Sequence, residues 1–277
     1  SWDNFIVDGF LIHPYDSIGV MGPVMARQLD ELHGVDSKRQ AALGVPVRRM
    51  YEEVLAGSAY DLRAKYSIPA GTPIITYIAV STMACYDTLE IVEGLARAIL
   101  DGRVPQAVLL VRTQPGQDPS EFLARLGPLP CVRIQVAGNR GGGGEGRIDF
   151  DRHDENVEYA ATIAQAQAVV SNLSACVIDA CVADVPTIVN AVEISAYPPA
   201  AFSPRAIVDL DPFDLRETGL PIARTMPELL EHVSAALRNP AATEVSRRRA
   251  AQASDYCAHD YVERFLEMVS GEARSPA

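Results

Sequence analysis

Residues 168 to 190 read AVVSNLSACVIDACVADVPTIVN, and this stretch decides the fold class. A short β-branched run ends at Ser171, small polar residues turn the chain, and we expect a helix from Ser174. A second apolar run, Thr187 to Asn190, follows that helix. Strand, helix and strand in close succession are typical of a parallel sheet, because parallel strands need a crossover between them.

The neighbouring segments repeat this alternation. Expected strands are Ile74 to Val80, Ala107 to Val111 and Cys131 to Val136, and expected helices are Thr88 to Leu100, Pro119 to Leu126 and Asp154 to Ala166. The first of these strands, IITYIAV, is almost wholly apolar, as expected of a strand that is buried on both faces. The sequence therefore predicts an α/β fold with a doubly wound, parallel, Rossmann-like sheet.

The segment Ile68 to Pro73 divides the chain, because its two prolines and one glycine prevent a continuing helix. We place three units at residues 1–67, 68–240 and 241–277: the closing part of a first domain, a second domain that binds a ligand, and a helical tail that packs back on both. The expected elements of the first unit are a strand at Asp16 to Val20, a helix at about Pro23 to Leu32, a short strand near Ala41 and a polar helical stretch to Tyr66. Toward the C-terminal end we expect two amphipathic helices, Met226 to Leu237 and Ala242 to Val269, joined at Asn239-Pro240.

Composition limits the class of protein. The 277 residues are 48% hydrophobic and 22% charged, as in globular proteins, and the net charge of −12 disfavours binding to nucleic acid or to more than the periphery of a membrane. Five cysteines without a C-x-x-C pair indicate free thiols in a reducing cytoplasm. No secretory signal is recognisable, and the opening without methionine is expected of part of a longer protein.

The turn and helix after Ser171 are the first candidate for binding chemistry. Ser171, Asn172 and Ser174 lie where free backbone amides and a helix dipole face the carboxyl edge of the sheet, which suits a diphosphate. The alternative role for Ser174 is that of a helix N-cap. Asp179 lies five residues further on, where it is expected to accept hydrogen bonds from ribose hydroxyls; the alternative is a solvated helix carboxylate.

Further candidates follow other strands at the same edge. Arg112 ends a central strand, where a cation would neutralise a leaving diphosphate or else pair with a neighbouring carboxylate. Ser81 and Thr82, after the first strand of the second domain, would add polar contacts. His153, at a helix start, would reach a pyrophosphate or a base, or would be a solvated loop residue. The glycine run 141–144 lacks the G-x-G-x-x-G spacing and is typical of a flexible surface loop.

The sequence holds no H-E-x-x-H or comparable metal-ligand spacing and no G-x-S-x-G elbow. We therefore expect neither a metal site nor a cofactor, and the catalytic residues cannot be assigned from these motifs.

Residues 171–180, SNLSACVIDA, resemble the donor-binding turn and helix of GT-B enzymes, where a D-S-S-x-x-x-E-A pattern precedes a proline-led strand. The resemblance is to the branch that contains CDP-glycerol glycerophosphotransferase-like and UDP-N-acetylglucosamine 2-epimerase-like proteins. Asp179 replaces the usual glutamate and Ala175 the second serine, so a non-catalytic binding module stays open as an alternative.

Other segments resemble the same branch in the same order. SWDN at 1–4, LHGV at 32–35 and LGVP at 43–46 are similar to its S-W-D-N, E-L-H-G-I and T-G-x-P series. LVRTQP at 110–115 is similar to L-V-R-x-H-P, without the histidine. The resemblance implies a GT-B enzyme that transfers a glycosyl or polyol-phosphate group from a nucleotide-diphosphate donor, such as a UDP or CDP derivative, to a cell-envelope acceptor. It equally allows a UDP-sugar 2-epimerase or hydrolase.

Overall fold

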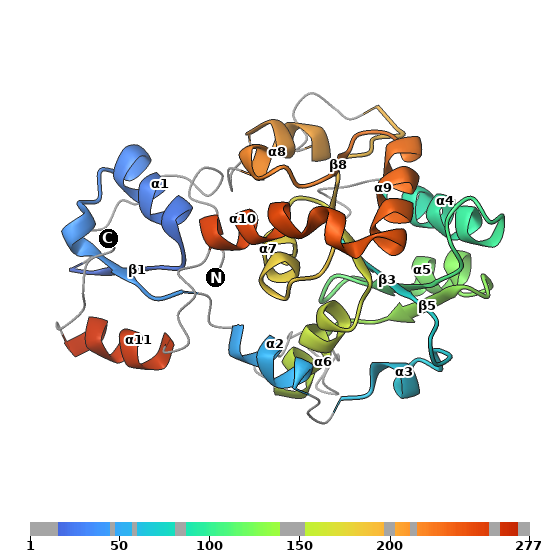
Figure 1. Ribbon diagram of the computed structural model, residues 1–277, viewed down its shortest axis with the longest axis horizontal. Helices are drawn as coiled ribbons and strands as arrows, with labels where there is room; N and C mark the ends of the chain where they lie inside the picture. Colours follow the sequence, from blue (N-terminus) through green and yellow to red (C-terminus); the bar gives the residue numbers. More distant parts are fainter. Residues whose placement is uncertain are drawn as a thin grey trace.

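A computed structural model describes residues 16–44, 48–56, 60–80, 87–138, 153–196, 203–210, 215–254 and 261–270 of the chain. Its larger part is a six-stranded sheet with helices on both faces, and its smaller part contains a two-stranded sheet (Figure 1). The predicted mixed α/β fold is therefore confirmed.

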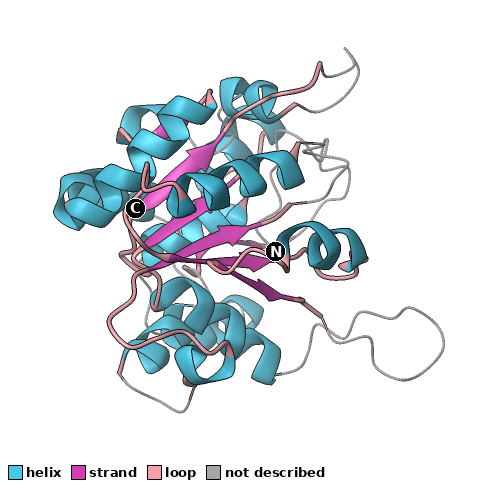
Figure 2. Cartoon of the chain, turned by 90° about the vertical axis from the view of Figure 1, so that its right-hand side faces the viewer, coloured by secondary structure: helices cyan, strands magenta, loops and turns pink. Residues whose placement is uncertain are grey.

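The larger sheet is built from the apolar runs of the sequence. Its strands are β3 (Ile74–Ile78), β4 (Val108–Arg112), β5 (Val132–Gln135), β6 (Ala168–Ser171), β7 (Thr187–Asn190) and β8 (Ile222–Ala223). The strand order is β5-β4-β3-β6-β7-β8. All neighbours are parallel, and Figure 2 shows the strand arrows running in one direction. Every residue of β3 and β4 is buried, because helices cover both faces of the sheet. The order of the strands reverses between β3 and β6, which is where such sheets bind ligands.

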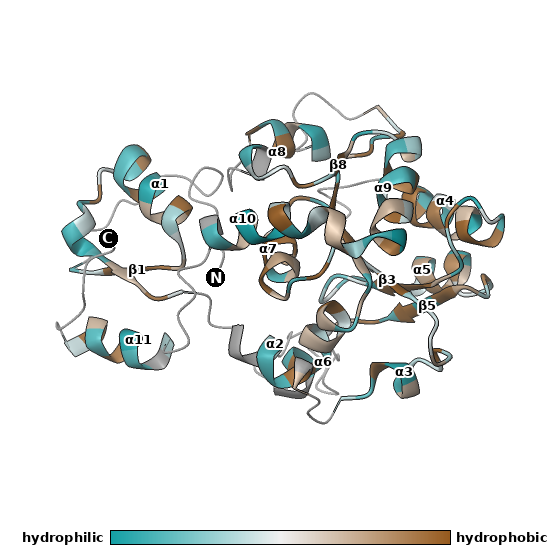
Figure 3. Cartoon of the chain, in the orientation of Figure 1, coloured by the Kyte–Doolittle hydropathy of each residue, from teal (hydrophilic) through white to brown (hydrophobic). Residues whose placement is uncertain are grey.

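Two layers of helices enclose this sheet. One face is covered by α4 (Thr88–Leu100), α5 (Ser120–Leu126) and α9 (Met226–Arg238). The other is covered by α6 (His153–Ala164) and α7 (Ala175–Val182), with α2 (Arg48–Leu55) packed on α6. Neighbouring residues of β6 point to opposite faces of the sheet. Val170 packs against the layer of α4, α5 and α9, and Val169 packs against the layer of α6 and α7. Figure 3 shows the strands of the larger sheet as mainly apolar.

The smaller sheet pairs β1 (Ile18–Val20) in parallel with β2 (Gln40–Ala42), and α1 (Pro23–His33) connects the two strands. The C-terminal helices reach it from the larger part. Helix α10 (Glu244–Ser254) contacts both α7 and α1, and α11 (Tyr261–Ser270) contacts β2 (Figure 1). Arg264 donates from Nη1 to the carbonyl oxygen of Ala42 at 3.0 Å, which fixes α11 against that strand.

Some expected elements differ in the structure. The polar stretch before Tyr66 forms two helices, α2 and α3 (Leu62–Lys65), and the described part of the tail contains α10 and α11 rather than one helix. Between α9 and α10 lies a short 3-10 helix, Pro240–Thr243. Helix α8 (Pro204–Leu210) and β8 were not predicted, since a two-residue strand carries too little periodicity to be recognised. Over the described ranges, no helix has the length and apolar character needed to cross a bilayer.

Candidate functional site

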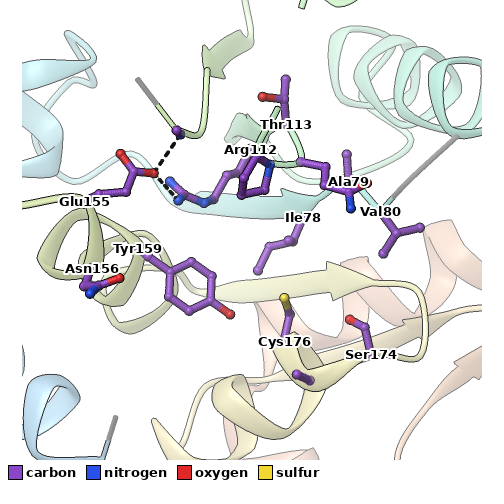
Figure 4. A pocket seen from close by; sticks show the side chains of 14 residues that line it. Ile78, Ala79, Val80, Arg112, Thr113, Glu155, Asn156, Tyr159, Ser174 and Cys176 are labelled. Carbon is purple, nitrogen blue, oxygen red and sulfur yellow. Dashed lines mark hydrogen bonds and ion pairs between the residues drawn. The ribbon is translucent and has the colours of Figure 1, made fainter. Parts of the chain in front are cut away.

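A cavity of about 360 Å³ opens at the carboxyl edge of the larger sheet. It lies where β3 and β4 end and where α6 and α7 begin. Its wall includes Ile78, Arg112, Glu155, Tyr159, Ser174 and Cys176 (Figure 4). This volume falls in the range of small-molecule sites, and the position beside the β3/β6 reversal is the one that open α/β sheets use for ligands.

The N-terminus of α7 forms one wall of the cavity. Ser174 is the N-cap residue, with extended backbone (φ −158°), and its side chain makes no capping hydrogen bond. Its hydroxyl lies 3.4 Å from that of Ser171. The next two residues, Ala175 and Cys176, also line the cavity. The first amides of a helix have no partner within it, so this wall offers N–H donors and the positive end of the dipole. Ser174 thus has the predicted position, whereas the capping hydrogen bond of the alternative is not formed.

Arg112 forms another part of the wall and is only 5% exposed. Its Nη2 donates to Glu155 Oε1 at 2.5 Å, so the alternative named for Arg112, pairing with a neighbouring carboxylate, is present. The backbone N–H of Gly138 donates to the same oxygen at 3.1 Å (Figure 4). Arg112 Nη1 is buried, and within the described part of the chain it has no acceptor. A buried donor left unpaired costs roughly 1–3 kcal/mol, which a ligand acceptor in the cavity would recover.

Tyr159 contacts both of these walls. The Arg112 guanidinium lies 5.2 Å from the centre of the Tyr159 ring, within range of a cation–π contact. The phenol at the other end of the ring donates to Asp179 Oδ2 at 2.7 Å. Burial, with a further contribution from the charge of Asp179, raises the pKa of Tyr159 well above its ordinary value. The phenol therefore stays a neutral hydrogen-bond donor at physiological pH.

Asp179 contacts Tyr159 of the cavity wall and is 4% exposed, so the alternative of a solvated helix carboxylate is wrong. Tyr51, from α2, is buried nearby. Burial, and then the charge of Asp179, raises the pKa of both Tyr51 and Cys176. Asp179 is not among the residues that line the cavity, and its predicted contact with a ribose stays a prediction.

The other predicted site residues have different surroundings. Ser171 is buried and its hydroxyl faces the carbonyl of Ile78 at 3.4 Å. Asn172 is buried and donates from Nδ2 to the carbonyl oxygen of Asn190 at 2.9 Å. His153 begins α6, and its side chain lies outside the described part of the structure. Ser81, Thr82 and the glycine run 141–144 also lie outside the described residues.

Solved structures are similar to this chain in fold. The UDP-GlcNAc 2-epimerase of Methanocaldococcus jannaschii, in complex with UDP-GlcNAc and UDP, matches with a TM-score of 0.59. The match covers 92% of this chain and 61% of that chain, at 11% sequence identity. The chain has the GT-B fold.

Two further structures match this GT-B chain to a similar degree. The wall teichoic acid polymerase TagF matches with a TM-score of 0.55 and 12% identity, over 92% of this chain and 57% of that one. The UDP co-structure of MnaA from S. aureus matches with a TM-score of 0.54 and 13% identity, over 91% and 59%. The chain thus spans about three fifths of the length of these proteins. No protein-family model and no curated protein sequence matches it.

Two cavity residues that contact Arg112 were missing from the prediction, Glu155 and Tyr159. Both are on α6, four residues apart and so on one helix face, and that face reaches the cavity. A helix that follows a strand of a doubly wound sheet begins at the carboxyl edge, as α7 does, and this rule is the signal that would have pointed to the first turns of α6.

Proposed function

We propose that the cavity binds a nucleotide-diphosphate donor, with the diphosphate at the N-terminus of α7. The observation that carries this proposal is the unpaired Nη1 of Arg112, buried in the cavity wall on the other side from Ser174 and the α7 amides. A charged ligand with several acceptor oxygens would satisfy both sets of donors. UDP or UDP-GlcNAc in structures of the same fold supports this class of ligand.

We further propose that the chain is the donor-binding part of an enzyme that transfers a glycosyl or polyol-phosphate group to a cell-envelope acceptor. The likeness to the wall teichoic acid polymerase supports transfer. The likeness to a UDP-GlcNAc 2-epimerase supports the alternative, epimerisation or hydrolysis of a UDP-sugar. Both reactions need the same donor site. The division at 1–67, 68–240 and 241–277 is part of this proposal.

The cytoplasm is the proposed location. The thiols of Cys131, Cys176 and Cys181 are free, which suits a reducing compartment and the cytoplasmic supply of nucleotide-linked donors.

Two substitutions of Ser174 test the diphosphate position. Ser174→Asp places a carboxylate at the helix start, where it favours the helix through N-capping and the dipole but repels a diphosphate. We expect at least about tenfold weaker binding of whichever of UDP, CDP, GDP and TDP the wild type binds, with an unchanged or higher Tm. Ser174→Asn, a neutral N-cap of similar size, is the matched control and should bind nearly as well as the wild type.

Titration calorimetry in EDTA is the measurement, because the α7 amides and Arg112 are expected to hold the ligand without a metal. Absence of binding by the wild type to all four nucleotides, with and without Mg²⁺, would contradict the proposal. If Ser174→Asp bound the nucleotide with unchanged affinity, the diphosphate could not lie at the N-terminus of α7.

A further inference from the structure

We propose that Tyr159 is the positioning residue of this cavity and that Asp179 acts through Tyr159 rather than on the ligand. This inference rests on the proposed nucleotide site and adds to it how the two walls of the cavity are held at their spacing. Tyr159 is suited to this because its ring lies against Arg112 (Figure 4) and its phenol donates to Asp179 of α7.

On the side of α7, the hydrogen bond from the Tyr159 phenol to Asp179 Oδ2, at 2.7 Å, joins α6 to α7. Asp179 lies five residues after Ser174, little more than one turn into the helix. A fixed contact at that point sets both the rotation of α7 about its axis and the depth of its first turn. The amides at the helix start therefore depend on this bond for their position in the cavity.

On the other side, α6 holds Arg112 with two residues. Glu155 pairs with Nη2, and the ring of Tyr159, one turn later on the same helix face, lies against the guanidinium. A guanidinium held by an ion pair and by a cation–π contact has little freedom to rotate. Nη1 is thereby kept in the cavity wall, where it is buried and unpaired among the described residues.

Tyr51 completes the buried cluster from α2. It is 2% exposed and packs into the same apolar core as α6 and α7. The Asp179 carboxylate thus lies among phenols that come from two other helices. Such a surrounding explains how a carboxylate is accommodated in the interior without lining the cavity, and it favours a role in orienting α7.

The test compares a nucleotide with inorganic pyrophosphate, which lacks the ribose. Tyr159→Phe removes only the phenol oxygen, and Asp179→Asn removes the charge of its partner. We expect each variant to weaken both ligands by the same factor, roughly three- to tenfold, the worth of one hydrogen bond. The double variant should be no weaker than either single one, because both changes break the same contact.

Tyr66→Phe is the matched control. Tyr66 also donates from its phenol to a carboxylate of α6, that of Glu158 at 2.5 Å, but neither residue lines the cavity. This variant should lose stability and keep the affinity of both ligands. Tyr159→Leu removes the ring as well as the phenol and should weaken binding further than Tyr159→Phe, since Arg112 loses its support.

Three results would contradict the inference, and the two measurements distinguish them. Weaker nucleotide binding with unchanged pyrophosphate binding in Asp179→Asn would place Asp179 on the ribose and overturn the inference. A lower Tm with both affinities unchanged would make the Tyr159–Asp179 bond merely structural, which also overturns it. If the wild type binds neither ligand, the proposed function fails and the inference fails with it.

Discussion

Glu155 and Glu158 lie three residues apart on α6, and they are held in different ways. Glu158 accepts from Lys65 Nζ at 2.7 Å and from the Tyr66 phenol at 2.5 Å, so it joins α6 to the chain around α3. Glu155 accepts from Arg112 and from the backbone of Gly138, and it lines the cavity. One carboxylate belongs to a cluster away from the cavity, and the other belongs to its wall.

The two carboxylates differ in whether the remaining hydrogen-bond donors of their cationic partners are satisfied. Lys65 is about half exposed, so water satisfies its remaining donors. Arg112 is buried, and its Nη1 has no acceptor in the part of the chain that the structure describes. An ion pair to a carboxylate of α6 therefore does not by itself indicate a ligand-binding site. A buried cation with an unused donor in a cavity wall is such a sign.

We expect the largest effect, on both stability and nucleotide affinity, from Arg112→Met, with Lys65→Met as its control. Loss of Arg112 leaves the partly buried Glu155 without its cation, and we expect a loss of about 2–3 kcal/mol in the free energy of unfolding. Nucleotide affinity should fall at least about tenfold, because the donor at Nη1 is removed. Lys65→Met should cost less than about 1 kcal/mol, since Lys65 is about half exposed, and should leave affinity unchanged, since Lys65 does not line the cavity. Urea unfolding and calorimetry on the two variants measure both quantities; equal effects would remove the distinction between the clusters.

The next effect concerns pH and Glu158. Burial would raise the pKa of Glu158, but hydrogen bonds from Lys65 and Tyr66 outweigh it and lower the pKa to about 2. An unfolded glutamate titrates near pH 4.3, so Glu158 stabilises the fold above that pH, and this contribution is lost as the pH falls toward 2. Glu158→Gln should therefore be about 1–2 kcal/mol less stable than the wild type at pH 7. This difference in the free energy of unfolding between the wild type and Glu158→Gln should become smaller below about pH 4.5.

Urea unfolding of the wild type and Glu158→Gln from pH 7 down to about pH 3 gives this difference directly. A gap that stays constant over this range would show that Glu158 has an ordinary pKa and that its cluster is weaker than the contacts indicate. Nucleotide affinity at pH 7 should be the same for both proteins, because Glu158 does not line the cavity.

The smallest expected effect is a gain of affinity. Glu155→Gln keeps a side chain that can accept from Arg112 but removes the charge that neutralises it. An anionic ligand then meets an uncompensated cation, and we expect pyrophosphate to bind roughly three- to tenfold more tightly. Calorimetry at low salt measures this change, with Glu158→Gln as the matched control. Weaker binding in Glu155→Gln would show instead that the carboxylate itself contacts the ligand.

The sequence predicted the parts of the fold that depend on local pattern. β6 and β7 have the predicted bounds, and Ser174 stands at the predicted helix start, because a β-branched run and a small polar turn act within a few residues. The placement of Arg112 at a strand end was predictable for the same reason. Glu155 and Tyr159 were missed, because nothing in the local sequence of α6 shows which of its faces meets β4 and α7.

By itself, then, the sequence determined a doubly wound parallel sheet and the edge of that sheet at which polar residues gather, since strand burial and helix periodicity are properties of neighbouring residues. Only the tertiary structure decided the partners of those residues. It buried Asp179 against the Tyr159 phenol, paired Arg112 with Glu155 and left Nη1 without an acceptor among the described residues. These contacts join segments that are 20 and 43 residues apart, and their geometry follows from how α6 and α7 pack on the sheet.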